Sequence, residues 1–188
     1  DALRHQAECD ALTRLANCTL FQNRLLDSRR HAAALAPLAA LIMFDIDGFT
    51  HVNDVHRHAA GDACLREIAR RLTAAFPDAA MVARIGGDEF AVLMRGGRGE
   101  TLPDALKARA ERATAAVAGP VIWRDLYLRV GASAGIATPA SPAAWDAEQL
   151  FLAADRALYT AKRIGCGGVR MARSGLERGG LAARLARA

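Results

Sequence analysis

The sequence predicts an α+β domain built on a split βαβ core, and three observations lead to this fold class. Short apolar runs alternate with amphipathic stretches of helical length, in the order strand, helix, hairpin, helix, hairpin, helix. Glycine or polar residues stand where the hairpins must turn. The length of 188 residues suits one domain, and no internal repeat or low-complexity linker divides it.

The first buried strand is the apolar run 41–44, which is too short for a helix. The helix that follows Gly61 stops at Pro77, because proline cannot continue a helix. Before the first strand, residues 1–29 are predicted to be helical, with an interruption near 15–19. The remaining predicted elements are strands 81–85 and 90–94, a helix over 103–117, a hairpin of strands 121–123 and 127–137, a helix from 146 to the glycines of 165–168, and a short strand 169–171.

Composition excludes several classes of protein. Hydrophobic residues make up 52% and charged residues 24%, which is typical of a folded domain rather than a disordered chain. The net charge is +5, but the arginines are scattered, so we expect no nucleic-acid partner and no direct membrane contact by this segment. The longest apolar run, 32–44, is shorter than the roughly 20 residues of a membrane span. With no signal peptide and no CxxC pair, the expected location is the cytoplasm.

Four carboxylates are predicted to meet at one edge of the sheet. A strand–helix–strand crossover makes the strands 41–44 and 81–85 parallel, so both end at the same edge. Asp45 and Asp47 follow the first of these strands, and Asp88 and Glu89 stand in the turn that follows the second. Carboxylates that approach one another raise each other's pKa or bind a cation. An oxygen-rich set without sulfur suits Mg²⁺, which commonly shares a phosphate with its protein ligands.

Some of these residues also have ordinary structural explanations. Gly86 and Gly87 allow backbone amides to approach a bulky anion, but a glycine pair is equally typical of a plain hairpin turn. Asn53 and Asp62 are both candidates for helix caps. Lys162 lies near a helix C-terminus, where a positive charge is favourable in any case.

Several motifs in fixed order carry a resemblance to a known family. Residues 84–90 read RIGGDEF and residues 10–17 read DALTRLAN; further motifs are FDIDGF at 44–49, ND at 53–54, GD at 61–62, SAGI at 133–136 and ADRALYTAK at 154–162. Together they resemble the GGDEF domain, the family of bacterial diguanylate cyclases, from about residue 10 to residue 169. The resemblance implies a ferredoxin-like, nucleotidyl-cyclase-type fold with a mixed central sheet flanked by helices.

The resemblance also implies an activity. Two molecules of GTP would condense into cyclic di-GMP with loss of two pyrophosphates. Each domain would hold one GTP, so that a homodimer is needed, with two Mg²⁺ or Mn²⁺ ions in each half-site. Phosphoryl-type transfer of this kind depends on alignment and charge neutralisation rather than on covalent catalysis by the protein.

Site residues follow from the resemblance by position. The metals would be held by Asp45, the carbonyl of Ile46, Asp88 and Glu89, and Asp88 and Glu89 are the catalytic candidates. The candidates for substrate binding are Asn53 and Asp62 at the guanine, Gly86, Gly87 and Lys162 at the phosphates, and Phe49 and Thr50 beside them. A carboxylate and an amide match the donors and acceptors of the guanine edge.

The sequence departs from the family pattern at several positions. Thr50 replaces the usual lysine, and Cys166 stands within the usual GRN, so two phosphate-binding cations are missing. Arg57 replaces a glycine, and Cys18 replaces an arginine. The RxxD product-inhibition site is also absent, because its positions carry Pro77 and Ala80. We therefore expect no feedback binding of cyclic di-GMP at that site.

These departures leave alternatives to an active cyclase. The domain could be a non-catalytic GGDEF domain that binds GTP and regulates a neighbour such as an EAL phosphodiesterase, or an interaction module without a nucleotide. The predicted organisation is a linker helix over 1–9 from an upstream regulatory region, the GGDEF domain over 10–172, and a basic helical tail or connector over 173–188. The expected partners are an upstream sensory domain and a possible downstream domain.

Overall fold

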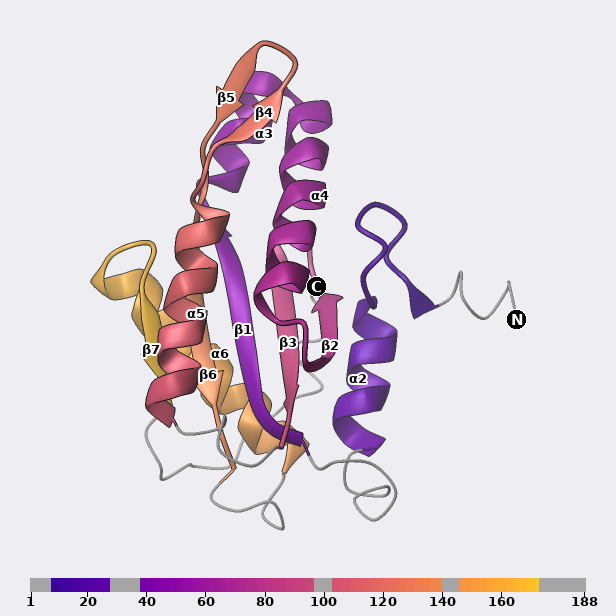
Figure 1. The fold of residues 1–188 in the computed structure, drawn as a ribbon, viewed down its shortest axis with the longest axis vertical. Helices are drawn as coiled ribbons and strands as arrows, with labels where there is room; N and C mark the ends of the chain where they lie inside the picture. The colour runs from indigo at the N-terminus through magenta and orange to yellow at the C-terminus, as the bar shows by residue number, and fades with distance from the viewer. Residues whose placement is uncertain (1–7, 28–37, 97–102, 140–145, 173–188) are drawn as a thin grey trace.

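The computed structural model describes residues 8–27, 38–96, 103–139 and 146–172. Its central sheet has five strands in the order β2-β3-β1-β6-β7, flanked by helices (Figure 1). The fold is therefore α+β with a mixed sheet, as predicted. The strands are β1 (Leu38–Asp47), β2 (Ala79–Arg84), β3 (Glu89–Arg95), β4 (Val121–Trp123), β5 (Leu126–Leu128), β6 (Gly131–Ala137) and β7 (Val169–Met171). The helices are α2 (Cys18–Asp27), α3 (Phe49–His56), α4 (His58–Ala75), α5 (Pro103–Val117) and α6 (Ala147–Ile164).

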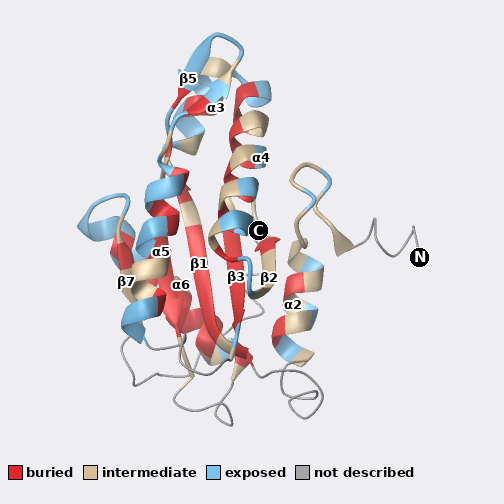
Figure 2. Cartoon of the chain, viewed as in Figure 1, coloured by how far each residue is buried: buried red, intermediate tan, exposed pale blue. Residues whose placement is uncertain are grey.

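Strand β1 lies in the middle of the sheet because both of its faces are apolar. It pairs antiparallel with β3 on one side and with β6 on the other. Ile42 and Phe44 pack into the core cluster that contains α4 and α5, whereas Leu41 and Met43 pack into the cluster that contains α2 and α6. Burial of alternate residues on opposite faces explains why the sequence reads as an unbroken apolar run. In Figure 2, β1 is buried along nearly its whole length.

Three sequence predictions need correction. The residues before Cys18 are not a continuation of the helix: residues 11–13 form a turn, in which Thr13 donates its amide and its hydroxyl to Asp10 Oδ1 at 2.8 and 2.6 Å. The predicted strand 127–137 is two strands, β5 and β6, of which β5 pairs only with β4. The strand at 41–44 extends over ten residues. The predicted tail over 173–188, and residues 1–7 of the linker helix, lie outside the described residues.

The junction between α3 and α4 is strained at Arg57. Its φ of 67° and ψ of 169° lie in a region that glycine adopts freely and other residues rarely do. The carbonyl of Asn53 accepts the Arg57 amide at 2.8 Å, which holds this conformation at the end of α3. The departure from the family glycine therefore costs backbone energy, and it adds a side chain that is exposed.

We expect Arg57→Gly to stabilise the domain. The strain amounts to about 1–3 kcal/mol, and the greater freedom of glycine in the unfolded chain offsets part of it, so a net gain of about 1 kcal/mol is expected. Urea unfolding of the two proteins measures it. The matched control is Arg66→Gly in the exposed interior of α4, which should lose about 1 kcal/mol. Equal losses in both variants would show that the junction is not strained.

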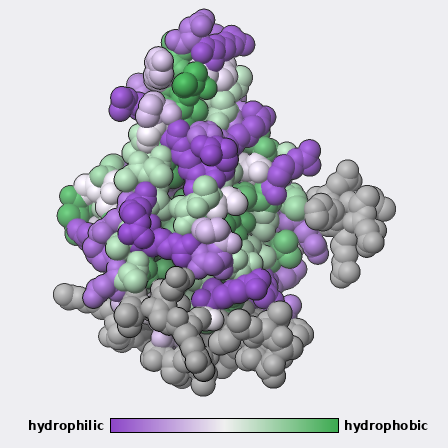
Figure 3. All heavy atoms as spheres, in the orientation of Figure 1, coloured by the Kyte–Doolittle hydropathy of each residue, from purple (hydrophilic) through white to green (hydrophobic). Residues whose placement is uncertain are grey.

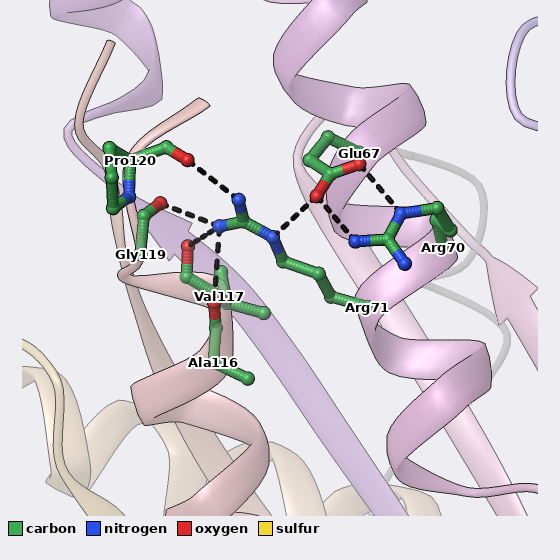
Figure 4. A network of polar contacts seen from close by, with 7 residues as sticks. All are labelled: Glu67, Arg70, Arg71, Ala116, Val117, Gly119 and Pro120. Carbon is green, nitrogen blue, oxygen red and sulfur yellow. Dashed lines mark hydrogen bonds and ion pairs between the residues drawn. The ribbon is translucent and has the colours of Figure 1, made fainter. Parts of the chain in front are cut away.

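Arg71 joins α4 to the end of α5 and the start of β4 (Figure 4). Its guanidinium donates to four main-chain carbonyls, those of Ala116, Val117, Gly119 and Pro120, at 2.5–3.1 Å. Its Nε donates to Glu67 Oε1 at 2.8 Å, and Arg70 holds the same carboxylate with two further bonds. Hydrogen bonds from Arg70, and then from Arg71, lower the pKa of Glu67 to about 2.

The depressed pKa of Glu67 predicts a loss of stability in acid. A carboxyl group whose pKa is lower in the folded state stabilises the fold above its unfolded pKa, and this contribution disappears as the pH falls. The stability of the native domain should therefore fall between about pH 4.5 and pH 2 more steeply than that of Glu67→Gln. The pair lies near the surface, so we expect a difference of about 1 kcal/mol at neutral pH. If the free energies of unfolding of the two proteins, measured by denaturation, change equally with pH over this range, Glu67 does not have a depressed pKa in the folded domain.

Candidate functional site

The two carboxylates at the ends of β1 and β3 are neighbours in the sheet. Asp45 is paired with Glu89 in the register of these strands, and the Ile46 amide donates to the Asp88 carbonyl at 3.1 Å. Strands β1 and β2 do run in the same direction, as predicted, but β3 lies between them. The hairpin that follows β2 therefore returns the chain directly alongside the end of β1.

Burial and mutual repulsion make this edge unfavourable for negative charge. The pKa of Asp45 is raised by burial, although the nearby Lys162 opposes the shift. The pKa of Glu89 is raised by burial first and then by Asp45 and Asp88. Glu89 is half-buried at the first position of β3 and does not lie in an exposed turn. Both shifts have the same meaning: the fold holds carboxylates here at a cost that a cation would relieve.

Lys162 supplies a counter-charge from α6. Its Nζ lies 2.5 Å from the buried Asp45 Oδ1, so that this oxygen is held by an ion pair. Although burial lowers the pKa of Lys162, contacts with Asp45, and the charges of Asp47 and Asp88, raise it overall. The ammonium group therefore stays charged at the carboxylate edge.

The glycine pair leaves space at this edge. A Cβ at Gly86 would stand 2.7 Å from Glu89 Oε2, whereas a Cβ at Gly87 would meet nothing within 4 Å. Neither glycine has a left-handed φ. Glycine at position 86 therefore leaves room for the Glu89 carboxylate to lie against the turn, and the surface above Gly87 stays open.

Asn53 and Gly61 meet where α3 packs against α4. A Cβ at Gly61 would stand 2.0 Å from Asn53 Oδ1 and 3.2 Å from Phe49 Cζ, so glycine is required for this approach. Asn53 Oδ1 is buried and has no hydrogen-bond partner among the described residues. The interpretation of Asn53 as a helix cap is wrong, because Asn53 lies inside α3 and Gly48 is the N-cap of that helix.

Asp62 and Thr50 are more accessible. Asp62 is the fifth residue of α4, so its interpretation as a helix cap is also wrong. Its carboxylate lies 4.0 Å from the Arg66 guanidinium, and its side chain is 47% exposed. Thr50 is exposed in the first turn of α3, close in sequence to Phe49. The described residues thus place Asn53 and Asp62 on adjacent helices that follow β1.

Two sets of contacts that position the site were not predicted from the sequence. Arg84 donates to both oxygens of Asp10 at 3.2 Å and to the Gly87 carbonyl at 2.8 Å, which ties the turn at Asp10 to the glycine turn. Asp47 Oδ2 accepts from Ser133 at 2.8 Å and from the Gly167 amide at 2.9 Å. The quoted motifs contain most of these residues, but partners 74 to 120 positions apart are not visible in a sequence.

The donor set fits a hard divalent cation. Asp45 and Glu89 are half-buried, and both have raised pKa values although the Lys162 ammonium lies beside Asp45. Oxygen-only ligands of this kind suit Mg²⁺. Within the described ranges no three His, Cys, Asp or Glu side chains already converge as a complete metal cluster. A cation here would accordingly need ligands from elsewhere, such as water or a bound phosphate.

Comparison with known proteins decides the family. The profile described as "Diguanylate cyclase, GGDEF domain" matches residues 7–167. The chain belongs to the GGDEF family. The GGDEF domain is 37% identical over 172 residues to the diguanylate cyclase TpbB of Pseudomonas aeruginosa, a match that covers 91% of this chain and 39% of that protein. It is 38% identical over 167 residues to an uncharacterized signaling protein of Caulobacter vibrioides, covering 89% of this chain and 20% of that protein.

Solved structures agree with the assignment. The isolated GGDEF domain of TpbB superposes with a TM-score of 0.74 at 34% identity, covering 88% of this chain and 94% of that one. The diguanylate cyclase SiaD of Pseudomonas aeruginosa, solved in complex with its activator SiaC, gives a TM-score of 0.76 at 31% identity and covers 91% of this chain and 64% of that one. The sequence spans less than half the length of the curated relatives named here. In the described part of the GGDEF domain, no helix is long and apolar enough to cross a lipid bilayer.

Proposed function

We propose that this GGDEF domain condenses two molecules of GTP into cyclic di-GMP and releases two pyrophosphates. The observation that carries the proposal is the pairing of Asp45 with Glu89 at an edge where the glycine turn leaves open space. The names of the relatives support the same reaction, since several are called diguanylate cyclases. In each half-reaction the 3′-hydroxyl of one GTP attacks the α-phosphorus of the other, and the bond to pyrophosphate breaks.

The chain's own residues would bind and orient the nucleotide. Asn53 and Asp62 would contact the guanine, where Asp62 accepts from its N–H donors and rejects adenine, which offers an acceptor instead. Gly86 and Gly87 would admit the phosphates. Lys162 would then neutralise phosphate charge in addition to that of Asp45. Phe49 and Thr50, at the start of α3, would contact the substrate beside these residues.

Asp45, the Ile46 carbonyl, Asp88 and Glu89 would hold Mg²⁺ or Mn²⁺, two ions in each half-site. When bound, these ions would activate the attacking oxygen and stabilise the leaving pyrophosphate. Asp88 would take the proton of the 3′-hydroxyl or lie beside the metal. Each domain would bind one GTP, so the reaction would require two domains to face each other as a homodimer.

The test is incubation of the protein with GTP and Mg²⁺, followed by chromatography for cyclic di-GMP. Because two domains must meet, the rate per domain should rise with protein concentration. Absence of product at every concentration would overturn the proposal. Thr50, Arg57 and Cys166 favour one second candidate, a non-catalytic domain that binds GTP and regulates a neighbouring domain. Binding of GTP without turnover would select this candidate.

Gly61→Ala tests the placement of the guanine contacts. The added Cβ would collide with Asn53 Oδ1, displacing both Asn53 and Phe49. We expect the affinity for GTP to fall at least about tenfold, which corresponds to the loss of roughly one hydrogen bond. The affinity for cytidine triphosphate should be as weak in the variant as in the native domain. Isothermal titration calorimetry measures both. An unchanged affinity for GTP would exclude Asn53 from the binding site.

A further inference from the structure

A groove of about 610 Å³ runs between α4 and β4, apart from the paired carboxylates. One wall is the exposed side of α4, and the other is the chain that enters β4. Figure 3 shows hydrophilic atoms gathered between α4 and α5, next to apolar atoms at the β4–β5 hairpin. The lining residues are Ala63, Arg66, Glu67, Arg70, Arg71, Pro120, Val121 and Ile122.

The charge of the groove is positive, and part of it is available to a partner. Glu67 is its one acidic lining residue, and Arg70 and Arg71 already hold that carboxylate (Figure 4). Arg71 is committed to main-chain carbonyls as well. The side chains of Arg66 and Arg70 are 57% and 68% exposed, and the ion pair of Arg66 with Asp62 is long, at 4.0 Å. These two guanidinium groups can therefore still receive carboxylates.

The second wall is apolar. Ile122 is 71% exposed, and Tyr127, which is paired with it across the hairpin, is 73% exposed. The hairpin has only two strands of three residues, and it projects from one end of the domain (Figure 1). Neighbouring exposed apolar side chains beside positive charge are typical of a surface that binds a protein segment.

We propose that the α4–β4 groove binds an acidic segment of another protein. Carboxylates of the segment pair with Arg66 and Arg70, and one large apolar side chain packs on Pro120 and Ile122. Charge complementarity selects an acidic partner, since the lining carries three arginines and one glutamate. The apolar wall selects a polypeptide over a small anion, which would leave Ile122 uncovered. The proposal does not depend on the GTP reaction, because it uses none of the proposed metal or catalytic residues.

A synthetic probe tests the groove. The probe is a fluorescein-labelled dodecapeptide of repeated Glu-Leu-Asp, and its counterpart has lysine in place of every Glu and Asp. Fluorescence polarisation should show binding of the acidic peptide alone, weakening as salt is raised. Arg66→Glu and Ile122→Asp should each weaken binding at least about tenfold. Arg95→Glu, which makes the same charge change at an exposed position at the far end of β3, should leave the affinity unchanged.

Several results would overturn the proposal. One is a dissociation constant for the acidic peptide weaker than about 1 mM; another is equal weakening by Arg95→Glu, which would show a nonspecific effect of charge. Displacement of the peptide by inorganic pyrophosphate at low millimolar concentration would identify an anion site instead. Self-association that Ile122→Asp abolishes would assign the surface to a second copy of this chain. Thermal unfolding of each variant confirms that the fold is intact.

Discussion

Glu89→Gln should abolish the formation of cyclic di-GMP while leaving the fold intact. The substitution keeps the size of the side chain and removes the charge that lies beside Asp45 at the start of β3. Loss of a charged group at the reacting centre costs at least about 100-fold in turnover. Turnover of GTP under saturating Mg²⁺ measures this effect.

The same variant should melt at a higher temperature than the native domain in the absence of divalent ions. Burial and the charges of Asp45 and Asp88 raise the pKa of Glu89, so its ionised form destabilises the fold at neutral pH. Opposite changes in activity and melting temperature would distinguish loss of a catalytic group from damage to the structure. A near-native rate would exclude Glu89 from the reacting centre, and a lower melting temperature would contradict the destabilising effect of its charge.

Gly135→Ala should unfold the domain or leave it marginally stable. A Cβ at Gly135 in β6 would stand 2.1 Å from the Ala154 carbonyl oxygen and 2.3 Å from the Leu158 amide nitrogen, both main-chain atoms of α6. Main chain cannot rotate aside as a flexible side chain can, so α6 would have to move away from the sheet. We expect a cost of about 3 kcal/mol or more, a large part of the stability of a typical domain.

Urea unfolding measures this loss, with Gly87→Ala as the control. At Gly87 an added Cβ meets nothing within 4 Å, and the backbone conformation is open to alanine, so stability should change little. A Gly135→Ala protein as stable as the Gly87→Ala protein would mean that α6 does not lie this close to β6.

The fold class could be predicted because hydrophobic pattern and turn residues agree along most of the chain. The run at 41–44 marked the central strand, and the predicted helix from 146 is α6, whose N-cap Asp146 accepts from the Gln149 amide at 3.0 Å. The failures have physical causes. The helical spacing of apolar residues runs through position 10, but the chain forms a turn there, because the Asp10 carboxylate accepts hydrogen bonds from the Thr13 amide and hydroxyl. The strand over 127–137 divides because β5 completes the small hairpin and β6 joins the main sheet.

The carboxylate edge could be predicted in outline. Parallel strand directions sufficed to bring Asp45 near Glu89, but not to show that β3 makes them direct neighbours. The ion pair between Lys162 and Asp45 links residues that no local pattern connects. For the same reason the ion pair between Arg84 and Asp10 could not be predicted from the sequence. Long-range contacts of side chains depend on packing, which a single sequence does not display.

The central place of β1 has a consequence for how the domain meets a ligand. Hydrogen bonds from β3 and β6 hold both edges of this strand, so its amides can exchange with deuterium only through large-scale opening. The main chain at Asp45 is thus already fixed before any ligand binds, and binding need not bear the entropy of ordering it.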